Sequence, residues 1–158
     1  MSHIYNIAKN DTNLNLITGN NGVLEWNDRT YYNKCLLISI YQCLCYAGII
    51  KDREEGKLFW HMAMEVYDFK SVNIQIEILS DTHTTSTNGV WDTSSNAYKH
   101  TNMIKGIASF YSIGIAFHKK KDHKIEEIHC ARIETEDAKK IIHIVSMPGH
   151  YEAMRIST

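Results

Sequence analysis

The chain has 158 residues and a mass of 18.2 kDa, the size of one ordinary domain that buries a core without disulfides. Hydrophobic residues make up 44% and charged residues 22%, which excludes a disordered chain, and the net charge of −1 gives no electrostatic basis for binding nucleic acid or an anionic membrane. We expect a single domain over residues 1–158, a monomer, with no nucleic-acid or membrane partner.

The N-terminal sequence lacks the long apolar run of a signal peptide, and no stretch approaches the roughly eighteen apolar residues of a membrane span. The expected location is therefore the cytoplasm. Three of the four cysteines, Cys35, Cys43 and Cys45, fall in one apolar segment, and their spacing with Cys130 does not suggest a disulfide framework. Reduced thiols are expected. In a helix, Cys43 and Cys45 would lie on nearly opposite sides and could not bind one metal.

The first half of the chain predicts two helices. The segment 35–49, "CLLISIYQCLCYAGI", is apolar on nearly every side, which is typical of a buried helix, and Gly48 is placed as its C-terminal stop. The segment 54–67, "EEGKLFWHMAMEVY", has apolar residues at helical spacing. We expect this second helix to be amphipathic and to pack one side inward.

The middle of the chain is polar and gives weaker signals. Residues 71–79 alternate apolar and polar side chains, which favours a strand, although they could also extend a helix. Residues 80–97 are dense in Thr, Ser, Asn and Asp and predict a long loop, which we expect to border a cleft. A short helix over 102–111 follows.

The last third predicts a sheet. Strands are expected over 113–119, 125–133, 141–146 and 150–156, with a helical or turn piece near 134–140. Pro148 and Gly149 are expected to form the turn between the last two strands. The predicted fold class is α+β, with a buried N-terminal helix packed on a small, mostly antiparallel sheet.

The segment "MPGHYEAM" near the C-terminus contains a candidate base and its orienting acid. In a strand, His150 and Glu152 point to the same face, so the carboxylate can reach the imidazole. Cys35 opens the buried helix, where the helix N-terminus and a nearby imidazolium would lower the pKa of a thiol. If the C-terminal strands lie along that helix end, the three residues form a Cys-His-acid triad.

Each candidate also has a purely structural interpretation. Cys35 could be a small buried hydrophobic residue, and His150 could be a surface turn residue. Glu152 could be an ordinary exposed carboxylate on a strand. In that case the acid would have to come from upstream, with Asp28 as the first candidate.

Three blocks of the sequence resemble the ovarian-tumour (OTU) family of cysteine deubiquitinases, most closely its otubain branch. "NKCLLISI" is similar to the family's Asp-Gly-Asn-Cys-Leu/Phe-x-x-Ser-Ile stretch. "MIKGIASFYSIGIAFH" is similar to the helix and central strand that follow in the family. "IHIVSMPGHYEAM" resembles its penultimate strand, Pro-Gly turn and His-Tyr-Asp/Asn strand. The blocks occur in the family's order but cover well under half of the chain.

The resemblance implies a papain-like OTU cysteine protease fold and a thiol-dependent deubiquitinase without cofactor or metal. It places the nucleophile at Cys35, the base at His150 and the acid at Glu152. The expected oxyanion donors are the backbone N–H groups of Tyr32, Asn33 and Lys34. The chain departs from the family at Tyr32 and Asn33, which stand where the family has Asp and Gly.

The implied partner is ubiquitin, polyubiquitin or a ubiquitin-like modifier, which occur in a eukaryotic or host cytosol. With 13 Lys against 4 Arg and much Ile and Asn, the composition hints at an AT-rich genome and a viral or bacterial effector. Two alternatives stay open. One is a catalytically inactive OTU-like module that binds ubiquitin, and the other is a different papain-like cysteine protease or acyltransferase.

The remaining histidines and tryptophans give no strong signal. His118, His123, His129 and Cys130 lie close together in the sequence, but their spacing matches no familiar zinc pattern, and "HKKKDH" is typical of a solvated turn. We therefore expect no metal site. Trp26, Trp60 and Trp91 are expected in the core or lining a cleft.

Overall fold

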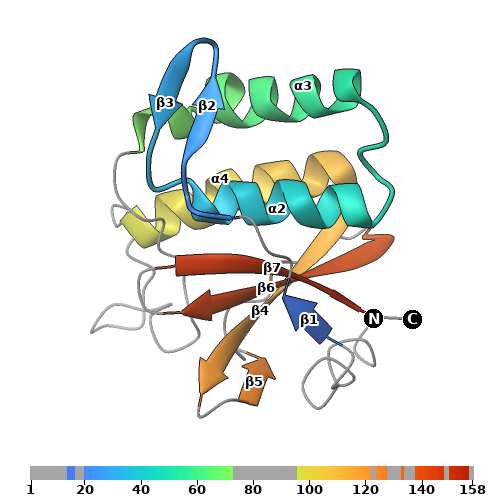
Figure 1. Ribbon diagram of the computed structural model, residues 1–158. Helices are drawn as coiled ribbons and strands as arrows, with labels where there is room; N and C mark the ends of the chain where they lie inside the picture. The colour runs from blue at the N-terminus through green and yellow to red at the C-terminus, as the bar shows by residue number, and fades with distance from the viewer. Residues whose placement is uncertain are drawn as a thin grey trace.

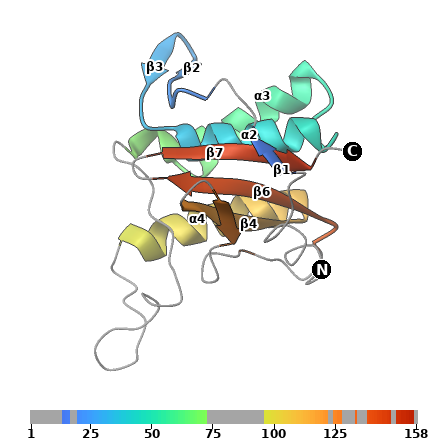
Figure 2. The same ribbon diagram turned by 60° about the horizontal axis from the view of Figure 1, so that its bottom comes forward.

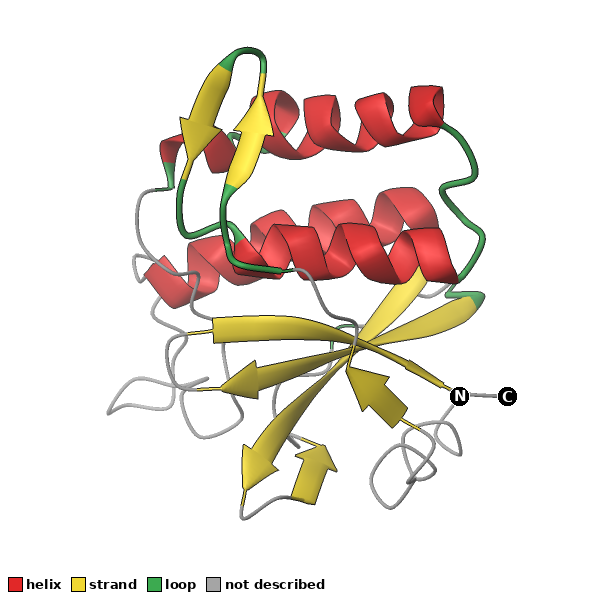
Figure 3. Ribbon diagram, in the orientation of Figure 1, coloured by secondary structure: helices red, strands yellow, loops and turns green. Residues whose placement is uncertain are grey.

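The computed structural model describes residues 14–16, 20–72, 96–121, 124–127, 133, 138–147 and 150–156. These residues form an α+β fold, in which a five-stranded sheet carries its helices on one face (Figures 1 and 3). The predicted α+β class is confirmed. None of the helices in the described ranges combines the length and hydrophobicity needed to span a membrane.

The large sheet has the strand order β1-β7-β6-β4-β5. Its strands are β1 (Leu14–Leu16), β4 (Ile113–Lys121), β5 (Lys124–Glu127), β6 (Lys140–Met147) and β7 (His150–Ile156). All neighbours are antiparallel except β4 and β6, so the sheet is mostly antiparallel, as predicted. Figure 2 shows β7, β6 and β4 in this order, with α2 beside β7 and α4 beside β4.

The helical segments are α2 (Cys35–Tyr46), α3 (Arg53–His61), η1 (Met62–Val66), η2 (Phe69–Ser71) and α4 (Asn96–Tyr111). The two helices predicted in the first half are confirmed, with η1 continuing α3 as one π-helical turn. Gly48 follows α2 at φ +75°, a conformation that glycine adopts without strain, and thereby ends the helix. The carboxylate of Asp52 begins α3 by accepting the Glu55 N–H at 2.9 Å.

A two-stranded hairpin, β2 (Leu24–Trp26) and β3 (Arg29–Tyr31), precedes α2 and stands beside α3 in Figure 1. Its two turn residues, Asn27 and Asp28, both have positive φ, the conformation of a tight hairpin turn. Asp28, the alternative triad acid, is therefore a turn residue. The hairpin was not predicted, although "NDR" after a tryptophan contains its turn signal.

Apolar side chains from the helices and one sheet face form the core. Leu37, Ile40 and Leu44 of α2 are fully buried, as expected for a helix that is apolar on nearly every side. Cys43 is buried and Cys45 is exposed, which confirms that the two thiols point in opposite directions. Since the core takes up the apolar surface of α2, burial holds this helix on the sheet.

Several predicted boundaries need correction. The helix α4 begins at Asn96, so the loop predicted over 80–97 ends at least two residues earlier than expected. Ser71, expected to begin a strand, ends the short helix η2 instead. Residues 73–79 of the predicted strand, and residues 80–95, lie outside the described residues.

The strand predicted over 125–133 appears as β5, which ends at Glu127, and as an isolated bridge between Ile115 and Ile133. Lys140, placed in a helical or turn piece, is the first residue of β6. Residues 128–132 and 134–137 lie outside the described residues, as does the Pro148-Gly149 turn. The strand predicted over 150–156 is confirmed as β7.

Two histidines are buried together on β4 and β6. His118 is fully buried and His143 is 3% exposed, and Nε2 of His118 lies 3.0 Å from Nδ1 of His143. The expectation that the segment beginning at His118 is a solvated turn is wrong at this residue. Burial, followed by the neighbouring His143, lowers the pKa of His118 to about 3. Because the folded protein binds a proton at His118 less readily than the unfolded chain does, the free energy of unfolding depends on pH.

We predict that His118 makes the protein less stable in mild acid. Between about 3 and about 6.5, the ordinary histidine pKa, the unfolded chain binds a proton at His118 that the folded chain does not. Falling pH therefore favours unfolding, by up to about 1.4 kcal/mol for each pH unit. The free energy of unfolding, measured by urea denaturation at several pH values in this range, should change less steeply with pH in His118→Gln than in the unmodified chain. The exposed His61→Gln is the control, and equal slopes for all three proteins would contradict the prediction.

Candidate functional site

The candidate site lies where the first residue of α2 meets the first half of β7. Cys35 opens α2 and is 4% exposed. Within the described residues, β1 pairs with residues 154–156 of β7, and the backbone of β7 near Tyr151 has other partners. Asn20 and Cys35 both form hydrogen bonds with the backbone of Tyr151 here. The structure thus brings Cys35 to the strand that carries His150 and Glu152.

The side chain of Asn20 fastens the start of α2 to the edge of β7. Its Nδ2 group donates to the Cys35 carbonyl at 2.8 Å, to Ser39 Oγ at 3.0 Å and to the Tyr151 carbonyl at 3.2 Å. Its Oδ1 atom accepts the Gly22 N–H at 3.0 Å. Asn20 is 9% exposed, so water competes little for these bonds. One amide therefore sets the distance between the helix that carries the thiol and the strand that carries the imidazole.

The Cys35 thiol is held in its protonated form by burial. Burial raises the pKa of Cys35, and the backbone N–H groups of Tyr151, Leu36 and Cys35 itself lower it by less. The expectation of a lowered thiol pKa at the helix start is corrected, because loss of solvent outweighs the helix terminus. At neutral pH, a nearby base that takes the proton would favour the thiolate.

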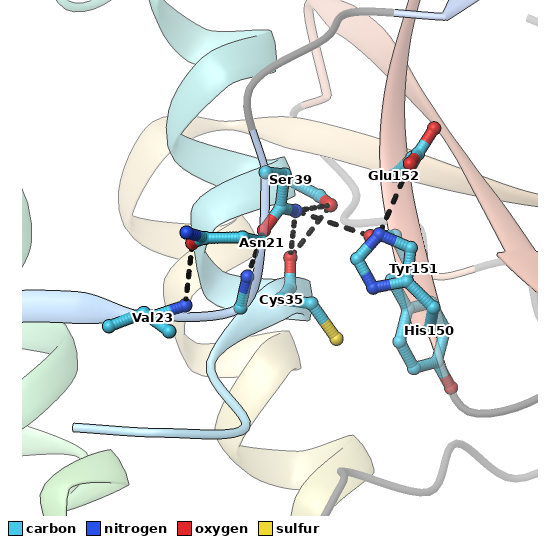
Figure 4. Close-up of polar contacts among 9 residues, drawn as sticks. Asn21, Val23, Cys35, Ser39, His150, Tyr151 and Glu152 are labelled. Carbon is cyan, nitrogen blue, oxygen red and sulfur yellow. Dashed lines mark hydrogen bonds and ion pairs between the residues drawn. The ribbon is translucent and has the colours of Figure 1, made fainter.

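His150 and Glu152 lie next to each other on the same face of β7, as predicted. Nε2 of His150 is 3.2 Å from Oε1 of Glu152, and the two side chains are 29% and 25% exposed. Figure 4 shows the His150 ring with the Glu152 carboxylate on one side and the sulfur of Cys35 on the other. With Nε2 directed at the carboxylate, Nδ1 is the ring nitrogen that can accept a proton from the thiol.

The segment before Cys35 has an unusual backbone. Asn33 has φ +58°, in the left-handed region that few residues other than Gly and Asn adopt. The Lys34 N–H, expected among the oxyanion donors, instead donates to the Gly22 carbonyl at 2.9 Å. That part of the expectation is corrected. The other two expected donors, the N–H groups of Tyr32 and Asn33, stay a prediction.

The described residues contain no group of three or more side chains that could hold a metal ion. A pocket of about 470 Å³ lies between the β2–β3 hairpin and α3. Trp26, Tyr41 and Trp60 line it, which places two of the three tryptophans at a cleft; Trp91 lies outside the described residues. None of the candidate triad residues lines this pocket, so we do not assign the chemistry to it.

No family model matches the chain, and no curated protein or solved structure matches it at a significant level. The function is therefore inferred from the site residues and from the sequence motifs.

The side-chain contacts of two site residues were missed from the sequence. Asn20 stands in a polar, Asn-rich opening and contacts Tyr151 across 131 positions of the chain, so no local pattern marks it. Lys34 precedes the thiol in "NKC" and resembles a surface lysine, yet its side chain is buried. Only the fold shows what either side chain contacts.

We predict that Asn20→Ala loosens the junction of α2 and β7. Removing the amide leaves buried carbonyl groups of Cys35 and Tyr151 without this donor, which should lower the free energy of unfolding by about 2–3 kcal/mol. Denaturant titration measures the loss. Asn21→Ala is the matched control, because Asn21 is exposed and, among the described residues, its side chain accepts just the Val23 N–H at 3.0 Å. This variant should change stability by less than about 0.5 kcal/mol. Equal losses in both variants would contradict the role given to Asn20.

Proposed function

We propose that the chain is an OTU-like cysteine protease that hydrolyses the isopeptide bond at the C-terminus of ubiquitin. The observation that carries this proposal is the arrangement of Cys35, His150 and Glu152. A thiol at a helix start lies beside an imidazole whose far nitrogen contacts a carboxylate at 3.2 Å. This order of nucleophile, base and orienting acid is what thiol-dependent acyl transfer requires.

The chemistry follows from the positions of these groups. Nδ1 of His150 takes the proton of the Cys35 thiol, and the resulting thiolate attacks the carbonyl carbon of the terminal glycine. The imidazolium then returns the proton to the leaving lysine amine as the C–N bond breaks. A water molecule, deprotonated by His150, hydrolyses the thioester and restores the thiol. Glu152 keeps the ring oriented and stabilises its charged form.

The backbone at Asn33 supports the OTU resemblance independently of the triad. The family motif has Gly at this position, and the chain has the left-handed φ there that glycine adopts freely. Asn is among the few other residues that tolerate this conformation. The Gly-to-Asn departure therefore places at this position a residue that tolerates the same left-handed backbone as glycine.

One observation favours an alternative, a catalytically inactive module that binds ubiquitin. Cys35 is 4% exposed and burial raises the pKa of its thiol, as in a structural cysteine. A working enzyme has to overcome this by proton transfer to His150. The two functions differ in whether Cys35 bonds covalently to a ubiquitin electrophile.

We predict covalent capture of ubiquitin at Cys35. Ubiquitin carrying a C-terminal electrophile should form a one-to-one adduct, visible by intact-protein mass spectrometry and mapped to Cys35. Cys35→Ala should abolish both the adduct and the cleavage of ubiquitin chains, because Ala keeps the helix but lacks the nucleophile.

Cys45→Ala is the control for a merely accessible thiol, because Cys45 is exposed on the same helix, and this variant should react like the unmodified chain. Binding of ubiquitin without adduct formation would support the inactive module. The absence of both binding and capture would reject ubiquitin as the partner. Another papain-like activity would then be left.

A further inference from the structure

Lys34 is a buried lysine immediately before the candidate nucleophile. The residue is 1% exposed, and its ammonium donates to the Val72 carbonyl at 2.6 Å and to the Tyr32 carbonyl at 3.2 Å. It also lies 5.9 Å from the centre of the Tyr31 ring. Among the described residues, no carboxylate forms a salt bridge with it. Burial lowers the pKa of Lys34. Burying an ammonium group costs solvation free energy. Packing alone therefore does not explain a lysine at this position.

The contacts of Lys34 fix the backbone on both sides of Asn33. The peptide before Asn33 is held through the Tyr32 carbonyl, which accepts the Lys34 ammonium. The peptide after Asn33 is held through the Lys34 N–H, which donates to Gly22. Both peptide planes around a left-handed residue are therefore pinned by one lysine. Without these bonds, Asn33 could relax toward a more favourable φ by turning a flanking peptide.

The direction of the Asn33 N–H follows from the geometry of a trans peptide. The C=O and N–H of one peptide point in opposite directions, and none of the described peptide bonds is cis. Because the Tyr32 carbonyl turns inward to the buried ammonium, the Asn33 N–H turns outward. Tyr32 and Asn33 are both exposed, and Cys35 follows two residues later. The Asn33 N–H therefore lies on the side of its peptide opposite to the Lys34 ammonium, in the segment that leads into the thiol.

We propose that Lys34 is a positioning residue that holds the Asn33 N–H where it can donate to the oxyanion formed when Cys35 attacks a carbonyl. The inference rests on the proposed function and deepens it, since it explains how a chain with Tyr and Asn in place of the motif's Asp-Gly keeps an oxyanion site. The lysine side chain contacts no reacting atom. It acts by fixing a backbone donor before the substrate arrives. Stabilisation of the transition state by such a donor is sensitive to small displacements of the N–H group.

The test is the variant Lys34→Met, which keeps the length and the burial of the stem but removes the ammonium donor. Turnover of a ubiquitin substrate should fall on the order of tenfold to a hundredfold in kcat with KM nearly unchanged, because the lost interaction is made mainly in the transition state. Alkylation of Cys35 by iodoacetamide creates no oxyanion, so its rate should not change. The exposed Lys57→Met is the matched control and should turn over normally.

The outcomes separate the two proposals. An inactive unmodified chain rejects the proposed function, whereas an active chain with unchanged kcat in Lys34→Met rejects the role of Lys34. Equal losses of turnover and alkylation would show that Lys34 only supports the fold, which also overturns the proposal.

A measurement on the unmodified chain covers the case in which Lys34→Met does not fold. Ubiquitin aldehyde forms a tetrahedral adduct with an active thiol, and its oxygen should move the NMR signal of the Asn33 amide proton downfield. Alkylation with iodoacetamide should leave that signal in place. An Asn33 signal that responds equally to both reagents, or to neither, would overturn the assignment.

Discussion

The side-chain amide of Asn20 joins the start of α2 to the edge of β7, and the arrangement of the candidate site depends on this junction. Cys35 belongs to the first half of the chain, whereas His150 and Glu152 lie near its end. Apolar burial brings α2 onto the sheet but does not by itself set where the helix begins relative to the strand. The directed bonds of Asn20 to the Cys35 and Tyr151 carbonyls supply that register. The chemistry is therefore positioned by a polar contact inside an apolar fold.

A second polar residue, Lys34, acts on the other side of the thiol. Its ammonium and its N–H hold the peptides around Asn33, while Asn20 also holds Gly22, the acceptor of the Lys34 N–H. The two buried side chains thus form one continuous set of bonds around the helix start. Such a set is costly to bury and is stable only when its donors are satisfied, which gives the segment a single backbone conformation. A preorganised oxyanion site needs this property.

The sequence predicted the elements whose patterns are local. The apolar run from Cys35 gave α2, and the strands around His143 and His150 appeared within one residue of their observed bounds. The contact between His150 and Glu152 followed from the two-residue period of a strand. Long-range features could not be predicted in the same way. Burial of Cys35 and the bonds of Asn20 depend on which surfaces meet in three dimensions.

Burial also explains the errors in the sequence interpretation. His118 begins the polar segment "HKKKDH", but β4 continues through it and carries its ring into the interior beside His143. The thiol pKa was expected to fall because of the helix terminus, and it rises because the same packing that positions Cys35 also removes it from water. These results connect the fold to the central question of the site, whether His150 can take the proton of a buried thiol.

The pH dependence of Cys35 alkylation tests this question most directly. If His150 takes the proton, the unmodified chain should react with iodoacetamide at neutral pH, whereas His150→Gln should react slowly there. The variant should gain reactivity only above about 8.5, the ordinary thiol pKa, because burial raises the pKa of Cys35. The rates can be followed by mass spectrometry of the Cys35 peptide. Identical pH profiles for the two proteins would show that the thiol and the imidazole do not act as a pair, and would contradict the account.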